Sequence, residues 1–154
     1  MEVYESTETI EDTLKDKYLT FSLGSELYGF TIEYVTEIIS IRPITKVPEL
    51  PDYVKGVINL RGKIIPVMDL RIRFKQPVPE YDQRTCIVIV QVNDIAMGIV
   101  ADKVLEVSTI LPDRLSDPPN TSKEGNNKYI WKLGTTQSGV IMLLDIEKLI
   151  WDEK

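Results

Sequence analysis

The chain of 154 residues contains no histidine and a single cysteine. Histidine is the commonest general acid–base residue and metal ligand, so its absence excludes Ser-His-Asp and Cys-His catalysis. A zinc site would need to be mostly carboxylate, which is unusual. A lone cysteine cannot form an intrachain disulfide, and Cys86 lies in an apolar run, which favours a buried core residue. We therefore expect no metal, no cofactor and no catalytic residue.

Positive charge is also scarce, with 18 Lys and Arg against 24 Asp and Glu and a net charge of −6. Nucleic-acid binding needs clustered Lys and Arg, so this balance argues against nucleic acid and anionic membrane surfaces as ligands. No apolar run approaches the roughly 20 residues of a membrane helix. Residues 1–17 are acidic and polar, unlike a signal peptide. We expect a cytoplasmic protein with a flexible acidic tail over residues 1–17 and one domain over residues 18–151.

Short alternating segments dominate the rest of the chain. Leu19, Phe21 and Leu23 alternate with polar residues, which predicts a half-buried strand. Similar strands are expected at residues 27–32, 56–60, 63–68, 85–92, 95–101, 103–110 and 140–144. A short amphipathic helix is predicted over residues 33–39 from the i, i+3, i+4 spacing of its apolar residues, and another after Asp145. Many short strands with few helices indicate an all-β sandwich or barrel.

Two segments echo each other, residues 65–70 and residues 141–146. Each reads as a strand that ends in an Asp able to cap a following helical turn. Two related barrels would produce this echo, and so would chance.

Sites for chemistry are few. Residues 56–64 look superficially like a phosphate loop, but five residues separate the glycines instead of four, and Ile64 replaces the hydroxyl that binds Mg²⁺. Asp69, Asp102 and Asp145 each follow an apolar strand. They favour turn stabilisation or helix capping over a carboxylate pair for hydrolysis, which stays an alternative.

The segment Gly56-Val57-Ile58-Asn59-Leu60-Arg61-Gly62, followed by Pro66 and Asp69-Leu70-Arg71, closely resembles the CheW-like chemotaxis coupling family. Residues 19–39, 98–107 and 143–149 are also similar to that family, so the resemblance covers about residues 18–150. One departure is Lys132, where the family usually has Gly. The neighbouring Trp131 is assigned neither to the core nor to a contact surface.

The resemblance implies two intertwined five-stranded SH3-like barrels that share a hydrophobic core, with short helices that include one at the C-terminus. It also implies a chemotaxis adaptor, recruited to membrane receptor arrays, that couples methyl-accepting chemoreceptor tips to the regulatory domain of the histidine kinase CheA without catalysis. The expected receptor-binding residues are Val35, Glu37, Ile38, Gly56, Arg61, Gly62 and Val107. The kinase-binding candidates, from the segment after residue 40, are Ile41, Arg42, Ile44 and Val47.

Two alternatives keep a binding function. One is the same coupling role in a pathway that controls pili, biofilm or development. The other is a generic SH3-like peptide-binding module, which needs an aromatic-lined groove from a chain that is only 8% aromatic.

Overall fold

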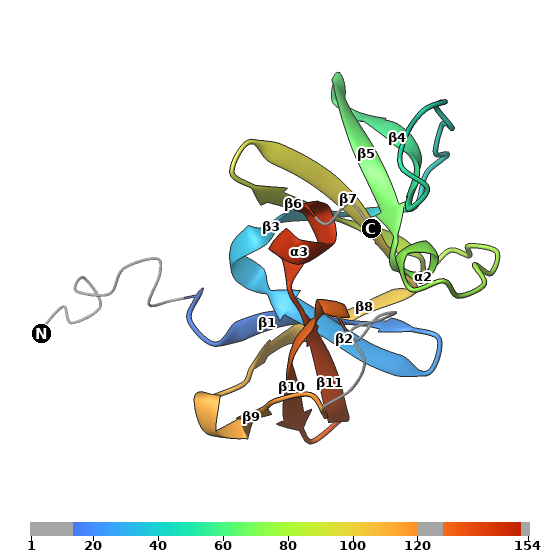
Figure 1. Cartoon of the computed structure of the whole chain (residues 1–154). Coiled ribbons are helices and arrows are strands. Elements are labelled where there is room, and N and C mark those ends of the chain that lie inside the picture. Colours follow the sequence, from blue (N-terminus) through green and yellow to red (C-terminus); the bar gives the residue numbers. More distant parts are fainter. Residues whose placement is uncertain (1–13, 120–127, 152–154) are drawn as a thin grey trace, which may run out of the picture.

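A computed structural model describes residues 14–119 and 128–151, and these residues form two sheets that share a common core (Figure 1). Most of the expected acidic tail lies outside the described residues, so its flexibility stays a prediction. No helix in the described ranges has the length and apolar character needed to cross a membrane.

The first sheet, sheet A, combines strands from the two ends of the chain in the order β8-β1-β2-β11-β10-β9. Its strands are β1 (Lys17–Leu23), β2 (Glu26–Thr31), β8 (Lys103–Thr109), β9 (Leu115–Ser116), β10 (Ile130–Thr136) and β11 (Gly139–Leu144). The second sheet, sheet B, comes from the middle of the chain in the order β3-β6-β7-β5-β4. Its strands are β3 (Val35–Ser40), β4 (Val54–Leu60), β5 (Lys63–Asp69), β6 (Cys86–Val92) and β7 (Ile95–Ala101).

The two sheets repeat one topology. Five strands of sheet A, in the order β8-β1-β2-β11-β10, match β3-β6-β7-β5-β4 of sheet B in direction, including one parallel pair each, β2 with β11 and β7 with β5. The sixth strand, β9, has its counterpart in the single bridge between Thr45 and Val57. The echo between residues 65–70 and 141–146 is therefore structural, because β5 and β11 occupy equivalent places.

The sheets are intertwined by two crossing strands. The β1–β2 hairpin belongs to sheet A, but the next strand, β3, joins sheet B, and the β6–β7 hairpin of sheet B is followed by β8 in sheet A. The prediction of two intertwined barrels is confirmed, with the short β9 as an addition to the expected five strands.

The predicted helix over residues 33–39 is wrong. Only Ile32–Tyr34 form a 3-10 turn, η2, and residues 35–40 form β3, which pairs with β6. Thr36 and Ile38 face solvent while Ile39 packs inward, so the helix-like spacing came from an exposed isoleucine on a strand. Four of the six residues of β3 are β-branched, which agrees better with a strand than with a helix.

The remaining helices are short. η3 spans Pro112–Arg114, α2 spans Leu70–Arg73 and α3 spans Ile146–Trp151. Asp69 caps α2 by accepting the Arg71 N–H at 2.9 Å, and Asp145 caps α3 by accepting the Lys148 N–H at 3.1 Å. Both Asp residues thus have the capping role that the sequence favoured.

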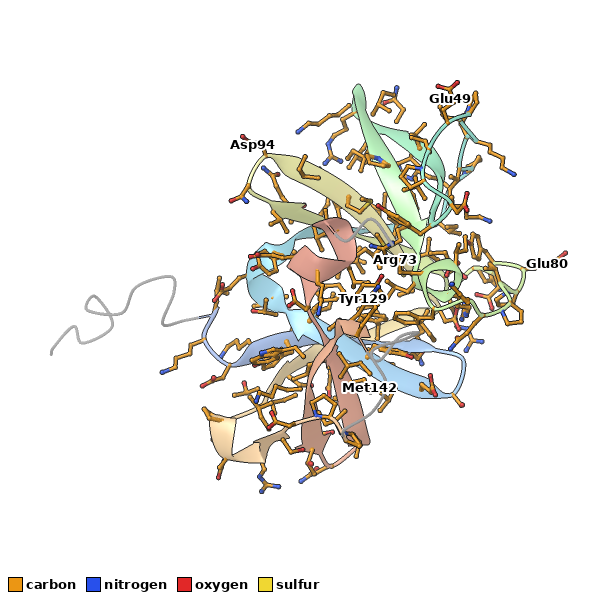
Figure 2. The ribbon with its side chains drawn as sticks, in the orientation of Figure 1. Glu49, Arg73, Glu80, Asp94, Tyr129 and Met142 are labelled. Carbon is orange, nitrogen blue, oxygen red and sulfur yellow. The ribbon has the colours of Figure 1, made fainter. Side chains whose placement is uncertain are left out.

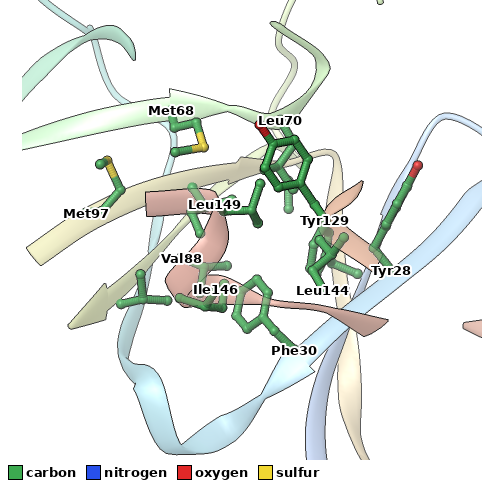
Figure 3. Close-up of a cluster of buried hydrophobic side chains, with 14 of the residues drawn as sticks. Tyr28, Phe30, Met68, Leu70, Val88, Met97, Tyr129, Leu144, Ile146 and Leu149 are labelled. Atoms are coloured by element: carbon green, nitrogen blue, oxygen red, sulfur yellow. The ribbon is translucent and has the colours of Figure 1, made fainter. Parts of the chain in front are cut away.

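Three apolar clusters hold the fold together. One fills the inside of sheet B around Ile58, Val67 and Ile87, and a smaller one fills sheet A around Ile110 and Leu143. The largest lies between the sheets, where α3 inserts Ile146 and Leu149 among residues from both (Figure 3). Its labelled members come from both sheets, from α2 and α3, and from the residue before β10, namely Tyr28, Phe30, Met68, Leu70, Val88, Met97, Tyr129, Leu144, Ile146 and Leu149. This shared core fixes how the two barrels sit against each other.

Candidate partner-binding site

The β4–β5 hairpin ends in a tight turn at Arg61 and Gly62, at the top of Figure 1. Both residues have positive φ, 53° and 87°, and the Gly62 N–H donates to the Asn59 Oδ1 at 2.8 Å. A left-handed backbone at a non-glycine residue costs roughly 1–2 kcal/mol. Glycine adopts a positive φ without a Cβ clash, so the strain of this turn lies at Arg61.

Arg61 forms an ion pair with Glu37. Glu37 lies on β3 and Arg61 follows β4, and these strands are the two opposite edges of sheet B. The ion pair therefore connects the two edge strands of sheet B and helps to close this sheet into a barrel. The Arg61 side chain is 69% exposed and that of Glu37 is 32% exposed, so both charged groups stay within reach of a partner.

A hollow of about 320 Å³ lies beneath this pair. Its walls include the charged groups of Glu37, Arg61 and Lys63, while Leu60 and Ile65 supply apolar surface. A carboxylate from a partner could bind Arg61 here only by exchanging with, or adding to, Glu37. The guanidinium is suited to this because its planar set of donors can serve two acceptors.

The other expected receptor-binding residues are not all assembled here. Val35 is half-buried against the shared core, while Ile38 is 42% exposed on the outer face of β3. Gly56 is buried, and a Cβ at this position would lie 2.3 Å from the Thr45 carbonyl oxygen, so its small size serves the bridge between Thr45 and Val57. Val107 is 52% exposed but lies on β8 of sheet A, and it does not line the hollow.

The kinase-binding candidates also divide into residues that pack in the core and residues that are exposed. Ile41 and Ile44 pack against the apolar cluster inside sheet B, which gives them a structural role. Val47 is 37% exposed and stands at the start of a hollow lined by residues 46–52 and 54. Arg42 is half-buried, and its Nε is buried without a hydrogen-bond acceptor among the described residues.

An exposed apolar residue of the β4–β5 hairpin was not among the expected site residues. Ile64 is 60% exposed beside the Arg61–Gly62 turn, where it pairs across the hairpin with Asn59. Consecutive residues of a strand face opposite sides, and Ile65 points into the apolar cluster of sheet B, so Ile64 points outward.

A buried polar cluster ties the two barrels together. The Arg71 guanidinium, almost fully buried after β5, forms an ion pair with Asp102, which also accepts the Gly24 N–H of the β1–β2 turn at 2.7 Å. Tyr81 donates to the second oxygen of Asp69 at 2.7 Å. Burial, followed by this hydrogen bond, raises the pKa of Tyr81 well above its usual range.

The three acidic residues considered for hydrolysis do not form a catalytic set. Asp69 and Asp102 both contact Arg71, while Asp145 caps α3 at another place in the fold. Asp69 and Asp145 accept backbone N–H groups of their own helical turns, which is the role that the sequence favoured. Asp102 instead accepts the N–H of Gly24, which lies 78 positions away in the β1–β2 turn, and pairs with Arg71. Among the described residues no group of three Cys, Asp or Glu side chains could hold a metal ion.

Cys86 is half-buried at the start of β6 instead of fully buried as expected, and its thiol contacts the Arg84 carbonyl at 3.3 Å.

Comparison with known proteins decides the family. The family model described as CheW-like domain matches residues 17–154. The chain belongs to the CheW-like domain family. The Chemotaxis protein CheW of Klebsiella aerogenes is 34% identical over 143 residues, which are 93% of this chain and 86% of that protein. The Chemotaxis protein CheW of Thermotoga maritima is 33% identical over 143 residues, which are 92% of this chain and 93% of that protein.

A solved structure shares the CheW-like fold as well. The crystal structure of the scaffolding protein TtCheW from Thermoanaerobacter tengcongensis matches with a TM-score of 0.80 at 34% identity, over 90% of this chain and 95% of that one. The two-barrel arrangement described above is therefore that of a CheW-like protein.

Proposed function

We propose that this chain is a chemotaxis adaptor that couples methyl-accepting chemoreceptors to the histidine kinase CheA, by binding both and without catalysis. The observation that carries the proposal is the family match over residues 17–154, with relatives named Chemotaxis protein CheW and a scaffolding protein of the same fold. Such an adaptor acts in the cytoplasm and is recruited to membrane receptor arrays through its partners.

The Arg61–Glu37 pair is the proposed centre of the receptor contact. A receptor tip is a helical hairpin, and helices dock by laying a face into a groove. Arg61 stands on a rigid turn, is largely exposed and can reach a carboxylate or carbonyl at a helix tip. Glu37 holds the guanidinium in place when no partner is bound. Ile38 and Val107 supply exposed apolar surface on the two crossing strands.

For the kinase contact the structure favours a narrower set than the sequence did. Val47 is exposed, whereas Ile41 and Ile44 support the sheet B core, so substitutions of these two would act on stability first. We propose Val47, with the exposed Ile64 of the adjacent hairpin, as the apolar part of that surface.

The test compares Arg61→Ala with Arg84→Ala in co-sedimentation with receptor-containing membranes and the kinase. Arg84 is a matched control, because its side chain is 71% exposed and pairs with Asp82 at 3.9 Å, away from the hollow. Arg61→Ala should weaken coupling by about 2 kcal/mol, the range of interface hot spots. It should change the free energy of unfolding by less than about 1 kcal/mol, because exposed ion pairs add little stability.

Equal coupling by the two variants would refute the role of Arg61. Failure of the unsubstituted chain to co-sediment with both partners would refute the adaptor function itself. A pulldown that instead recovers a kinase of a pili, biofilm or development pathway would place the same coupling role outside swimming chemotaxis.

A further inference from the structure

Trp131 is an exposed aromatic residue that the coupling function does not use. It lies on β10, where the pairing with β11 shifts register between Ile130 and Lys132, so Trp131 occupies a β-bulge. Bulges redirect a side chain out of the regular alternation and are enriched beside functional sites. The Trp131 residue is 45% exposed, an unusual amount for the largest apolar side chain.

The indole lines a cavity of about 310 Å³ at the end of sheet A nearest the start of β1. Two further aromatic residues, Tyr18 of β1 and Tyr34 of η2, form its walls, and the turn into α3 contributes Asp145. Aromatic residues of three separate elements thus line one opening, with Tyr18 almost fully buried in its wall. Aromatic faces carry partial negative charge and attract cations.

The charged residues that line this cavity also favour a cation. Three carboxylates, those of Asp16, Glu33 and Asp145, line it together with the ammonium of Lys15. A second ammonium, that of Lys132, lies 6.0 Å from the centroid of the Trp131 ring. The pKa values of the two tyrosines reflect this negative charge. Burial is the largest cause that raises the pKa of Tyr18, and the nearby carboxylates of Asp16 and Glu33 raise it further. Burial and the hydrogen bond from Tyr34 to Glu147 raise the pKa of Tyr34 to about 12.

We propose that this cavity binds the guanidinium of an arginine in a basic segment of a partner protein. A planar, weakly hydrated cation can stack on the Trp131 indole while its edge donates hydrogen bonds to Glu33 or Asp16. Lysine fits less well, because a strongly hydrated ammonium has no flat face. The inference does not depend on the coupling role, since none of these residues lines the hollow at Arg61.

The chain's own N-terminal segment is a poor occupant on grounds of charge. Residues 1–13 contain five carboxylates, Glu2, Glu5, Glu8, Glu11 and Asp12, and no Lys or Arg. Such a segment is repelled by an acidic cavity, whereas a basic segment from another protein is attracted.

The experiment titrates the ¹⁵N-labelled full chain with the capped tripeptide Gly-Arg-Gly and follows the indole N–H signal of Trp131, which Trp131→Leu identifies by its loss. The same tripeptide with citrulline in place of arginine keeps the shape and removes the charge. We expect a saturable shift with arginine and an affinity at least about tenfold lower with citrulline, since the charge drives both the stacking and the hydrogen bonds.

Variants locate the binding. For these variants the binding of the arginine peptide is followed by backbone amide signals. Trp131→Leu should bind it at least about fivefold more weakly. Trp131→Tyr keeps an aromatic ring, so its affinity should stay within about threefold of that of the unsubstituted chain. Glu33→Gln should weaken binding by about threefold or more, and Glu80→Gln, the same change in the loop before β6 at the right of Figure 2, should not.

Three results would overturn the proposal. The first is equal binding of the citrulline peptide, and the second is unchanged binding by Trp131→Leu. The third is a rise in affinity of about tenfold or more on deletion of residues 2–13, because the chain's own segment would then be the occupant.

Discussion

Asp102→Ala tests whether the buried ion pair holds the two barrels together. Asp102 begins the crossing into sheet A and accepts from the Arg71 guanidinium and the Gly24 N–H. The Arg71 side chain is 6% exposed and that of Asp102 is 30% exposed. Truncation therefore leaves a cation that is almost fully buried without its counter-charge.

The magnitude follows from that burial. Breaking a buried pair from one side costs about 3–5 kcal/mol. Water can reach the partly exposed Asp102 position and solvate part of the guanidinium, so we expect about 2–4 kcal/mol here. With total stabilities of about 5–15 kcal/mol, the variant should still fold.

Urea unfolding measures the loss. At a slope of about 2 kcal/mol per molar, in the middle of the usual range, the midpoint should fall by about 1–2 M. Asp117→Ala is the control, because Asp117 also forms an ion pair, with Lys132, but its side chain is 80% exposed. Loss of this exposed ion pair should lower the free energy of unfolding by less than about 1 kcal/mol. Adding Arg71→Met to Asp102→Ala should restore at least half of the loss, because the unpaired charge is then gone.

A loss no larger than that of Asp117→Ala would refute this reasoning. So would strict additivity of Arg71→Met and Asp102→Ala, since additive effects would mean that the two groups do not interact.

Two further predictions concern contacts of the C-terminal helix. Leu149→Ala should lower the free energy of unfolding by about 2–5 kcal/mol in urea, since Leu149 is fully buried in the shared core. Lys148→Ala, at an exposed position, should change it by less than about 0.5 kcal/mol, and similar effects of the two variants would contradict the packing of α3 between the sheets. The pKa of Tyr34 is raised from 10.0 to about 12, so its stabilising contribution is complete below pH 10 and is lost as the pH rises through 12. The urea midpoint should therefore fall less steeply across this range in Tyr34→Phe. An unchanged slope would count against the burial of Tyr34 and its hydrogen bond to Glu147, which together raise this pKa.

The local sequence determined most of the strands and both Asp caps. Alternation placed Leu19, Phe21 and Leu23 inside, and Asp69 and Asp145 cap their helices as expected, because both effects act within a few residues. The family resemblance supplied the two intertwined barrels, which alternation alone left as a sandwich or a barrel.

Only the tertiary structure decided the rest. Residues 35–40 became a strand because β6 offers an edge, and no local pattern records the presence of that edge. The pairing of Glu37 with Arg61 needs the sheet to close, since 24 positions separate the two residues. Arg71 and Asp102 lie 31 positions apart, and Trp131 meets Tyr18 and Tyr34 only where three elements converge. Contacts between distant segments depend on topology, and the sequence around each residue carries no direct record of it.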